Sequence, residues 1–194
     1  WRTAEYETAI DLINEGIEQL ADQGIGFLIQ RGRFHRQRDR HDLSTFDLRD
    51  ALEANPGAIR AHIELAQTLG ARQWHIERQH LLEDMLERWP DSLWAIRELG
   101  RCHQNLGYFD AAARSYRRAL SLAPGDITLL DMLAGLALVR SDFDEAIDAR
   151  RRVTEVHPHN AASALSYADM LSLAGQREEA RAQYRRLIEI APHW

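Results

Sequence analysis

LWAIRELGRCHQNLGYFDAAARSYRRALSLAP, residues 93–124, is the most regular stretch of the chain. Its apolar residues recur every three or four positions, which is the spacing of one face of an α-helix. The stretch ends at a proline, and all five prolines of the chain are separated by one constant interval, at Pro56, Pro90, Pro124, Pro158 and Pro192. Five prolines in one register indicate an internal repeat of about 34 residues.

Residues 93–124 resemble the tetratricopeptide repeat, whose pattern is W-x2-L-G-x2-Y, then A-x3-F, then P. The marked positions are occupied by Ile96, Leu99, Gly100, His103, Ala112, Tyr116 and Pro124. The tryptophan and tyrosine marks are substituted, and Tyr116 stands at the phenylalanine mark. The neighbouring units keep the same register, with Arg78 and Ser44 at the small position of the two weaker ones. The resemblance therefore covers essentially the whole chain.

This resemblance implies an all-α fold, an α-solenoid in which antiparallel helix pairs form a right-handed superhelix. We expect five repeats at 25–58, 59–92, 93–126, 127–160 and 161–194, preceded at 1–24 by the second helix of a truncated repeat. The expected helix pairs are 25–38/42–54, 59–71/74–88, 92–106/109–122, 126–140/143–156 and 160–174/177–190, with a single helix at 4–21 before them.

Several residues have predictable local roles in such a stack. Small residues allow helix axes to approach closely, and we assign this role to Gly100, Ala112, Ala119 and Ala146. Large residues fill the space between helices, and we assign this role to Leu99, Phe109, Tyr116 and Phe143. Gly107 and Gly175 can adopt the left-handed conformation that ends a helix. The expected N-caps are Asp91, Asp126 and Asn160.

Composition excludes several classes of function. The 24 basic residues are all arginine, so lysine Schiff-base chemistry is excluded, and the net charge of −6 argues against nucleic-acid binding. No apolar stretch is long enough to cross a membrane. The single cysteine, Cys102, cannot form an internal disulfide and is expected to be packed inside, which fits a cytoplasmic location. The chain begins at Trp1 rather than at Met, so we expect it to be part of a longer protein.

Catalytic and metal-binding patterns are missing from the sequence. The nine histidines are poorly spaced for zinc: His75 and His80 lie five residues apart, and His157 and His159 flank a proline. No nucleophile lies beside a base, and there is no glycine-rich phosphate loop. We therefore expect no enzyme activity, no cofactor and no metal.

The first helix of each repeat presents positions 2, 5, 9 and 12 on one face, which the resemblance places on the concave surface of the stack. Arginine and amide side chains gather there in the first three full repeats. The predicted partner-binding groove consists of Arg33, Arg36, Arg60, Gln67, Trp94, Arg97, Arg101, Gln104, Asn105 and Asp131. Guanidinium groups bind carboxylates bidentately, so this groove suits an acidic or C-terminal peptide segment.

The sequence leaves alternatives open. The groove arginines could instead pair internally with Glu64, Glu98 or Asp131, leaving a merely solvated face. The leading function is a non-catalytic scaffold for protein–protein interaction, and the alternative is a targeting or oligomerisation module of a larger enzyme. RNA binding through the basic run at residues 31–41 is a weaker alternative. Leu187, Ile188 and Ile190 on the last helix also suggest self-association.

Overall fold

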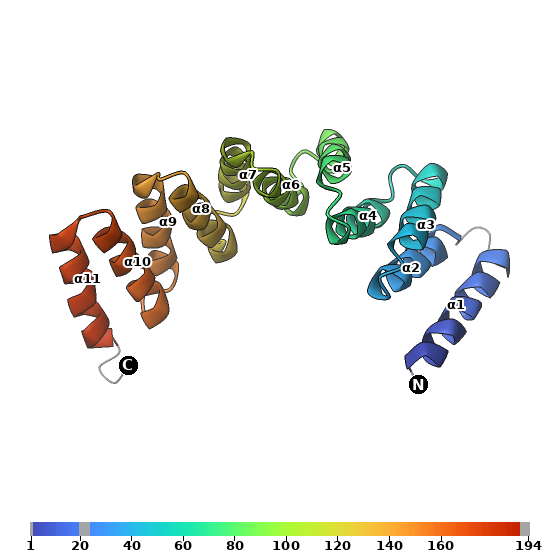
Figure 1. Cartoon of the computed structure of the whole chain (residues 1–194), viewed down its shortest axis with the longest axis horizontal. Coiled ribbons are helices and arrows are strands. Elements are labelled where there is room, and N and C mark those ends of the chain that lie inside the picture. Colours follow the sequence, from blue (N-terminus) through green and yellow to red (C-terminus); the bar gives the residue numbers. More distant parts are fainter. Residues whose placement is uncertain (1, 20–23, 191–194) are drawn as a thin grey trace. The chain divides into compact units, whose positions relative to one another are not determined.

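The computed structural model describes residues 2–19 and 24–190, and these residues form eleven α-helices and no β-strand. The helices are α1 (Arg2–Gln19), α2 (Gly24–Gln37), α3 (His41–Ala54), α4 (Ile59–Ala71), α5 (His75–Arg88), α6 (Leu93–Asn105), α7 (Phe109–Leu122), α8 (Ile127–Val139), α9 (Phe143–Val156), α10 (Ala161–Leu173) and α11 (Arg177–Ile190). After α1 they form five antiparallel pairs (Figure 1). The expected all-α solenoid is confirmed, and each helix lies within two residues of its expected bounds. Pro192 lies outside the described residues.

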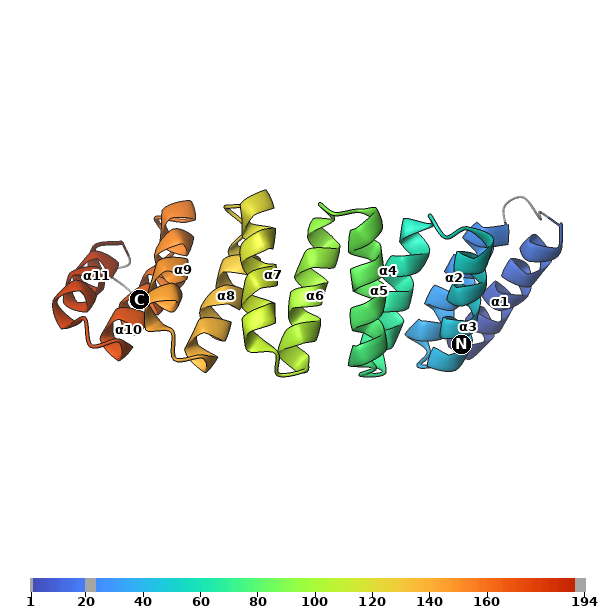
Figure 2. The ribbon, with the colours of Figure 1, turned by 90° about the horizontal axis from the view of Figure 1, so that it is seen from above.

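The chain divides into two compact units, unit 1 (Trp1–Pro90) and unit 2 (Asp91–Trp194). Unit 1 holds α1 to α5, with α2 and α4 on one side and α3 and α5 on the other (Figures 1 and 2). Unit 2 holds three helix pairs, α6 to α11. The division into five equal repeats and a partial one stays a prediction.

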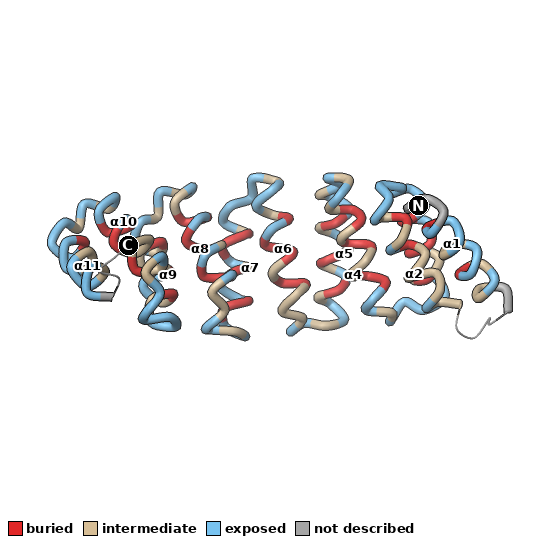
Figure 3. The backbone as a smooth tube through the Cα atoms, turned by 90° about the horizontal axis from the view of Figure 1, so that it is seen from below, coloured by how far each residue is buried: buried red, intermediate tan, exposed pale blue. Residues whose placement is uncertain are grey.

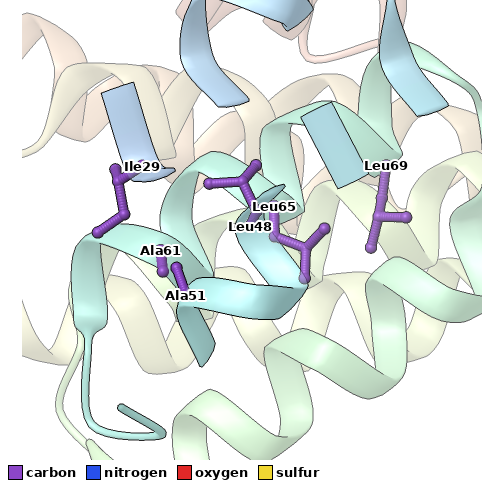
Figure 4. Packing of buried hydrophobic residues seen from close by; sticks show 6 residues of the cluster. All are labelled: Ile29, Leu48, Ala51, Ala61, Leu65 and Leu69. Carbon is purple, nitrogen blue, oxygen red and sulfur yellow. The ribbon is translucent and has the colours of Figure 1, made fainter. Parts of the chain in front are cut away.

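The core of unit 1 is built from α2, α3 and α4. Its buried members are Ile29, Leu48, Ala51, Ala61, Leu65 and Leu69 (Figure 4). A Cβ at Gly32 would lie 2.8 Å from Leu48 Cγ, so the glycine lets α2 approach α3 closely. Ser44 is fully buried at a small position, and its Oγ lies 2.9 Å from Thr68 Oγ1 in a hydrogen bond. Arg78, at the next small position, is buried against Gly70.

The core of unit 2 confirms the small positions assigned from the sequence. Ala112, Ala119 and Ala146 are fully buried, and a Cβ at Gly100 would lie only 2.5 Å from Tyr116 Cε1. Cys102 is also fully buried, as expected of a packed thiol.

The assignment of two aromatic residues to the space between helices was wrong. Phe109 and Phe143 are 37% and 40% exposed, respectively. Each is the first residue of its helix, α7 or α9, and follows a turn whose residues are all partly or fully exposed.

Burial falls toward the last helix. Figure 3 shows buried positions along the packed sides of the helices and exposed positions at the loops and on α11. Among the described side chains of α11 only Ala180 is buried, and Ile188 is 66% exposed. The Ile190 side chain lies outside the description. Self-association through this helix stays a prediction.

The turn inside each helix pair uses one left-handed residue, and the five such residues recur at the same interval as the prolines. Gly107 and Gly175 both have φ +79°, which confirms their assignment. The same position is held by non-glycine residues in the other pairs, with φ 57° at Asp39, 60° at Gln73 and 57° at Ser141. A side chain in this conformation is strained by its Cβ.

We expect Ser141→Gly to raise the free energy of unfolding by about 0.5–1 kcal/mol, because relief of left-handed strain exceeds the entropy that glycine loses. Gly107→Ala, at the same position of the preceding pair, should lower it by a similar amount. Urea unfolding of both variants measures the two changes. Shifts of the same sign in both variants would show that the turn conformation is not what decides stability here.

Helix N-caps follow the sequence at two of three expected positions. Asp126 accepts a hydrogen bond from Leu129 N, and Asn160 accepts one from Ser163 N. The assignment of Asp91 was wrong, because Ser92 is the N-cap of α6. The Ser92 hydroxyl accepts a hydrogen bond from Ala95 N at 3.4 Å. Ser92 directly precedes the first helical residue, where a side-chain oxygen can reach the free amides.

Candidate functional site

The surface formed by α2 and α4, here called the first-helix face of unit 1, contains an open cavity of about 420 Å³. Its lining residues are Gly26, Phe27, Ile29, Gln30 and Arg60. It combines two apolar side chains with an amide and a guanidinium. A Cβ at Gly26 would meet nothing within 4 Å, so the cavity is open beside this glycine.

Two cations of the first-helix face are available to a ligand. Arg33 and Arg60 are exposed and make no hydrogen bond or ion pair with the part of the chain that the structure describes. Arg60 lines the cavity, and Arg33 follows one helical turn after the lining residues Ile29 and Gln30 on α2. This arrangement places positive charge next to apolar surface.

Arg36, the third predicted groove arginine of unit 1, already has partners. Its NH2 group donates to Glu64 Oε2 at 2.7 Å and to Gln67 Oε1 at 2.8 Å. The bonds join α2 to α4 and neutralise a carboxylate whose side chain is only 12% exposed. Internal pairing, one of the alternatives left open by the sequence, therefore applies to Arg36.

The predicted groove residues of unit 2 are also largely engaged. Glu98, 5% exposed, attracts both Arg97 (Nε at 3.5 Å) and Arg101 (NH1 at 3.3 Å). Gln104 Oε1 accepts a 3.0 Å hydrogen bond from the Tyr116 hydroxyl. Burial raises the pKa of Tyr116 to about 12; the charge of Arg101 opposes this shift and that of Glu98 adds to it. The Tyr116 hydroxyl therefore stays protonated and remains a hydrogen-bond donor.

The remaining predicted residues of unit 2 have different surroundings. Asp131 pairs with Arg150 of α9 instead of with a groove arginine. Trp94 is half-buried and Asn105 is exposed. The ten predicted residues thus fall into two sets, one in each unit, and the exposed arginines without partners belong to unit 1.

Sequence reasoning missed a buried polar network in unit 1. Asp47, 2% exposed on α3, accepts from Arg31 Nε at 2.9 Å and from Arg31 NH2 at 2.6 Å. Arg31 NH1 also donates to Asn14 Oδ1 at 2.8 Å, which ties α1 to α2. His35 Nε2 lies 3.6 Å from Asp47, and His35 Nδ1 lies 2.7 Å from the Tyr6 hydroxyl. A carboxylate near Nε2 favours a proton there, so Nδ1 accepts from Tyr6.

The basic run at residues 31–41 is largely part of this network. Besides Arg31 and Arg36, the guanidinium groups of Arg38 and Arg40 lie 5.1 and 5.3 Å from the Tyr6 ring centroid. These cation–π contacts hold both arginines against α1. All arginines of the run except Arg33 therefore contact other parts of unit 1, which weakens the main observation behind RNA binding.

We expect the free energy of unfolding to fall as the pH drops below about 6.5. Burial lowers the pKa of both His35 and His62 in the folded protein. A lowered pKa means that the folded state binds protons less readily than the unfolded state, so acid favours unfolding. Urea midpoints at about pH 7.5 and about pH 5.5 measure the effect.

The double variant His35→Gln/His62→Gln should flatten this pH dependence, whereas His80→Gln, at an exposed position, should leave it unchanged. An equally steep pH dependence in the double variant would assign the effect to other groups.

The described residues contain no group of three or more His, Cys, Asp or Glu side chains that could hold a metal ion. They also contain no helix long and apolar enough to span a membrane.

Comparison with known proteins agrees with the repeat architecture. Two tetratricopeptide-repeat family models match the chain, one over residues 94–126 and the other over residues 132–193. None of the curated proteins matches the sequence significantly.

Solved structures of similar fold include a crystal structure of MamA, with a TM-score of 0.74 at 18% identity over 88% of this chain and 93% of that one. Another is YrrB, described as a TPR protein with an unusual peptide-binding site, with a TM-score of 0.69 at 18% identity over 93% of both chains. The constant register of the prolines, the helix pairs and these matches lead to one conclusion: this chain is a tetratricopeptide-repeat protein.

Proposed function

We propose that the chain is a non-catalytic scaffold for protein–protein interaction, and that the first-helix face of unit 1 binds an acidic peptide segment. The observation that carries the proposal is the pair of exposed, unpaired arginines, Arg33 and Arg60, beside the open cavity. The fold and the peptide-binding YrrB support a peptide as the ligand.

The chemistry of the cavity defines the segment further. Carboxylates are the natural partners of free guanidinium groups, which bind them through two parallel hydrogen bonds. Phe27 and Ile29 line the same cavity and offer apolar surface to an adjoining side chain. The segment should therefore carry a carboxylate, from Asp, Glu or the C-terminus, next to an apolar residue.

The Arg36–Glu64 pair supports binding without contacting the ligand. An unpaired Glu64 would repel an acidic segment, and Arg36 cancels this charge at a distance of 2.7 Å. The remaining charge of the face is that of Arg33 and Arg60. In unit 2 the buried Glu98 offsets Arg97 and Arg101 in part, which makes that set the weaker attractor.

The test begins with panning of a peptide-display library with free C-termini on the wild-type chain. The enriched peptides should contain Asp, Glu or a terminal carboxylate next to an apolar residue. A labelled enriched peptide should then bind Arg33→Ala/Arg60→Ala at least about tenfold more weakly, since each arginine makes a charge-assisted bond.

The matched control is Arg114→Ala/Arg185→Ala, which removes two exposed arginines from α7 and α11 and leaves the same net charge. Its affinity should stay within about twofold of wild type. Gly26→Leu should also weaken binding, because the new side chain would occupy part of the cavity that Gly26 lines. The fold should tolerate it, since a Cβ at Gly26 would meet no other atom within 4 Å. Equal losses in the two arginine doubles would overturn the proposed location.

A further inference from the structure

A second cavity lies on the other side of unit 1, between α3 and the turn from α4 to α5 that holds Arg72 and Trp74, and has a volume of about 360 Å³. The rings of Phe46 and Trp74 both line it. Phe46 is 61% exposed, an unusual state for a large ring on a helix, and Trp74 is 39% exposed. The cavity therefore leaves parts of two aromatic rings exposed to solvent.

The charged groups of this cavity leave an excess of negative charge. Arg72 pairs with Asp42, and Arg49 NH2 lies 3.1 Å from Glu77 Oε2. Two further lining carboxylates, Asp50 and Glu53, make no hydrogen bond or ion pair with the described residues, although Asp50 also attracts Arg31 electrostatically. Phe46, Asp50 and Glu53 follow one another at i, i+4 and i+7 and therefore share one face of α3.

The chain itself shows what kind of group these rings accept. The guanidinium carbon of Arg72 lies 3.7 Å from the centroid of the Trp74 ring, a close cation–π stack. Phe46 presents a more exposed ring on the same face of α3 as two carboxylates, and no cation of the described residues stacks on it. A second arginine from outside would find the same combination of ring and carboxylate.

We propose that the cavity between α3 and the α4–α5 turn binds a basic peptide segment. An Arg or Lys of the segment lays its aliphatic stem across Phe46 and places its charged head between Asp50 and Glu53. Apolar residues of the segment cover the remaining ring surface. An acidic or neutral segment would offer no cation to Asp50 and Glu53. Charge complementarity therefore favours a basic segment. This site is separate from the first-helix face and has the opposite charge preference.

The probe is a fluorescein-labelled nonapeptide of alternating Arg and Leu, and the comparison peptide has Glu in place of each Arg. Fluorescence anisotropy should show saturable binding of the arginine peptide. Phe46→Ser and Asp50→Asn/Glu53→Gln should each weaken it at least about tenfold, by removing the ring or the carboxylates. Both changes lie at surface positions, and circular dichroism melting verifies that the variants fold.

Two controls separate this site from general attraction to an acidic protein. Asp11→Asn/Glu15→Gln removes the same charge from exposed positions on α1 and should leave the affinity unchanged, as should Arg33→Ala/Arg60→Ala on the first-helix face. Equal weakening by Asp11→Asn/Glu15→Gln and Asp50→Asn/Glu53→Gln would overturn the proposal, as would the absence of binding at about 1 mM peptide.

Discussion

Replacing Asp47 by Ala is expected to lower the free energy of unfolding by about 3 kcal/mol, one of the two largest losses that the structure predicts. Asp47 is buried and receives two hydrogen bonds from Arg31, whose side chain is 22% exposed. Its removal leaves this guanidinium with the hydrogen bond to Asn14 and the weaker attraction of Asp50, and leaves His35 without its neighbouring carboxylate. Urea unfolding followed by circular dichroism measures the loss.

The double variant Asp47→Ala/Arg31→Met distinguishes an uncompensated charge from lost packing. Because it removes both ends of the pair, it should be less destabilised than Asp47→Ala alone. Glu87→Gln, an exposed carboxylate on α5, should have almost no effect. A double variant that is less stable than the single one would contradict the interpretation of the network as a charge pair.

Replacing Ala146 by Glu is expected to lower the free energy of unfolding by about 2–4 kcal/mol. Ala146 is fully buried on α9, in a cluster with Ala137 and Met170. The substitution forces extra methylene groups and a carboxylate into a fully buried, apolar contact between helices. Thermal and urea unfolding should both record the loss.

Ala162→Glu makes the same substitution at an exposed position near the start of α10 and serves as the control. Its stability should change by less than about 0.5 kcal/mol, because an acidic residue in a first helical turn is well tolerated. Equal stability of the two variants would mean that the assigned register of α9 is wrong.

The helices were predictable because one physical pattern repeats five times along the chain. The spacing of the prolines gave the register of the repeat. Within it, Gly107 marked the turn between the two helices of a pair, and Ala112 marked a position where two helices pack closely. The errors came from choices between neighbouring positions. Asp91 and Ser92 are both good N-caps, and only the backbone decides between them. Phe109 fits the pattern of a core residue but begins its helix.

The candidate site was predictable in outline only. The sequence places Arg36 and Arg60 on one helix face, but whether a guanidinium is free depends on distances between helices. Arg36 reaches Glu64 across 28 positions of sequence, whereas Arg60 meets no carboxylate among the described residues. The pairing of Arg31 with Asp47 was hidden for the same reason. A run of arginines in sequence looks like a basic surface until the residues on neighbouring helices are known.

The most direct test of the account is a charge reversal on the first-helix face of unit 1. The enriched acidic peptide is titrated against wild type and against Arg33→Glu/Arg60→Glu, and a peptide with Lys at its acidic positions is titrated against both proteins. We expect the acidic peptide to bind only the wild type and the lysine peptide to bind only the variant, with both affinities falling as salt screens charges over about 8–10 Å. Retention of the acidic peptide by the charge-reversed variant would contradict the central claim.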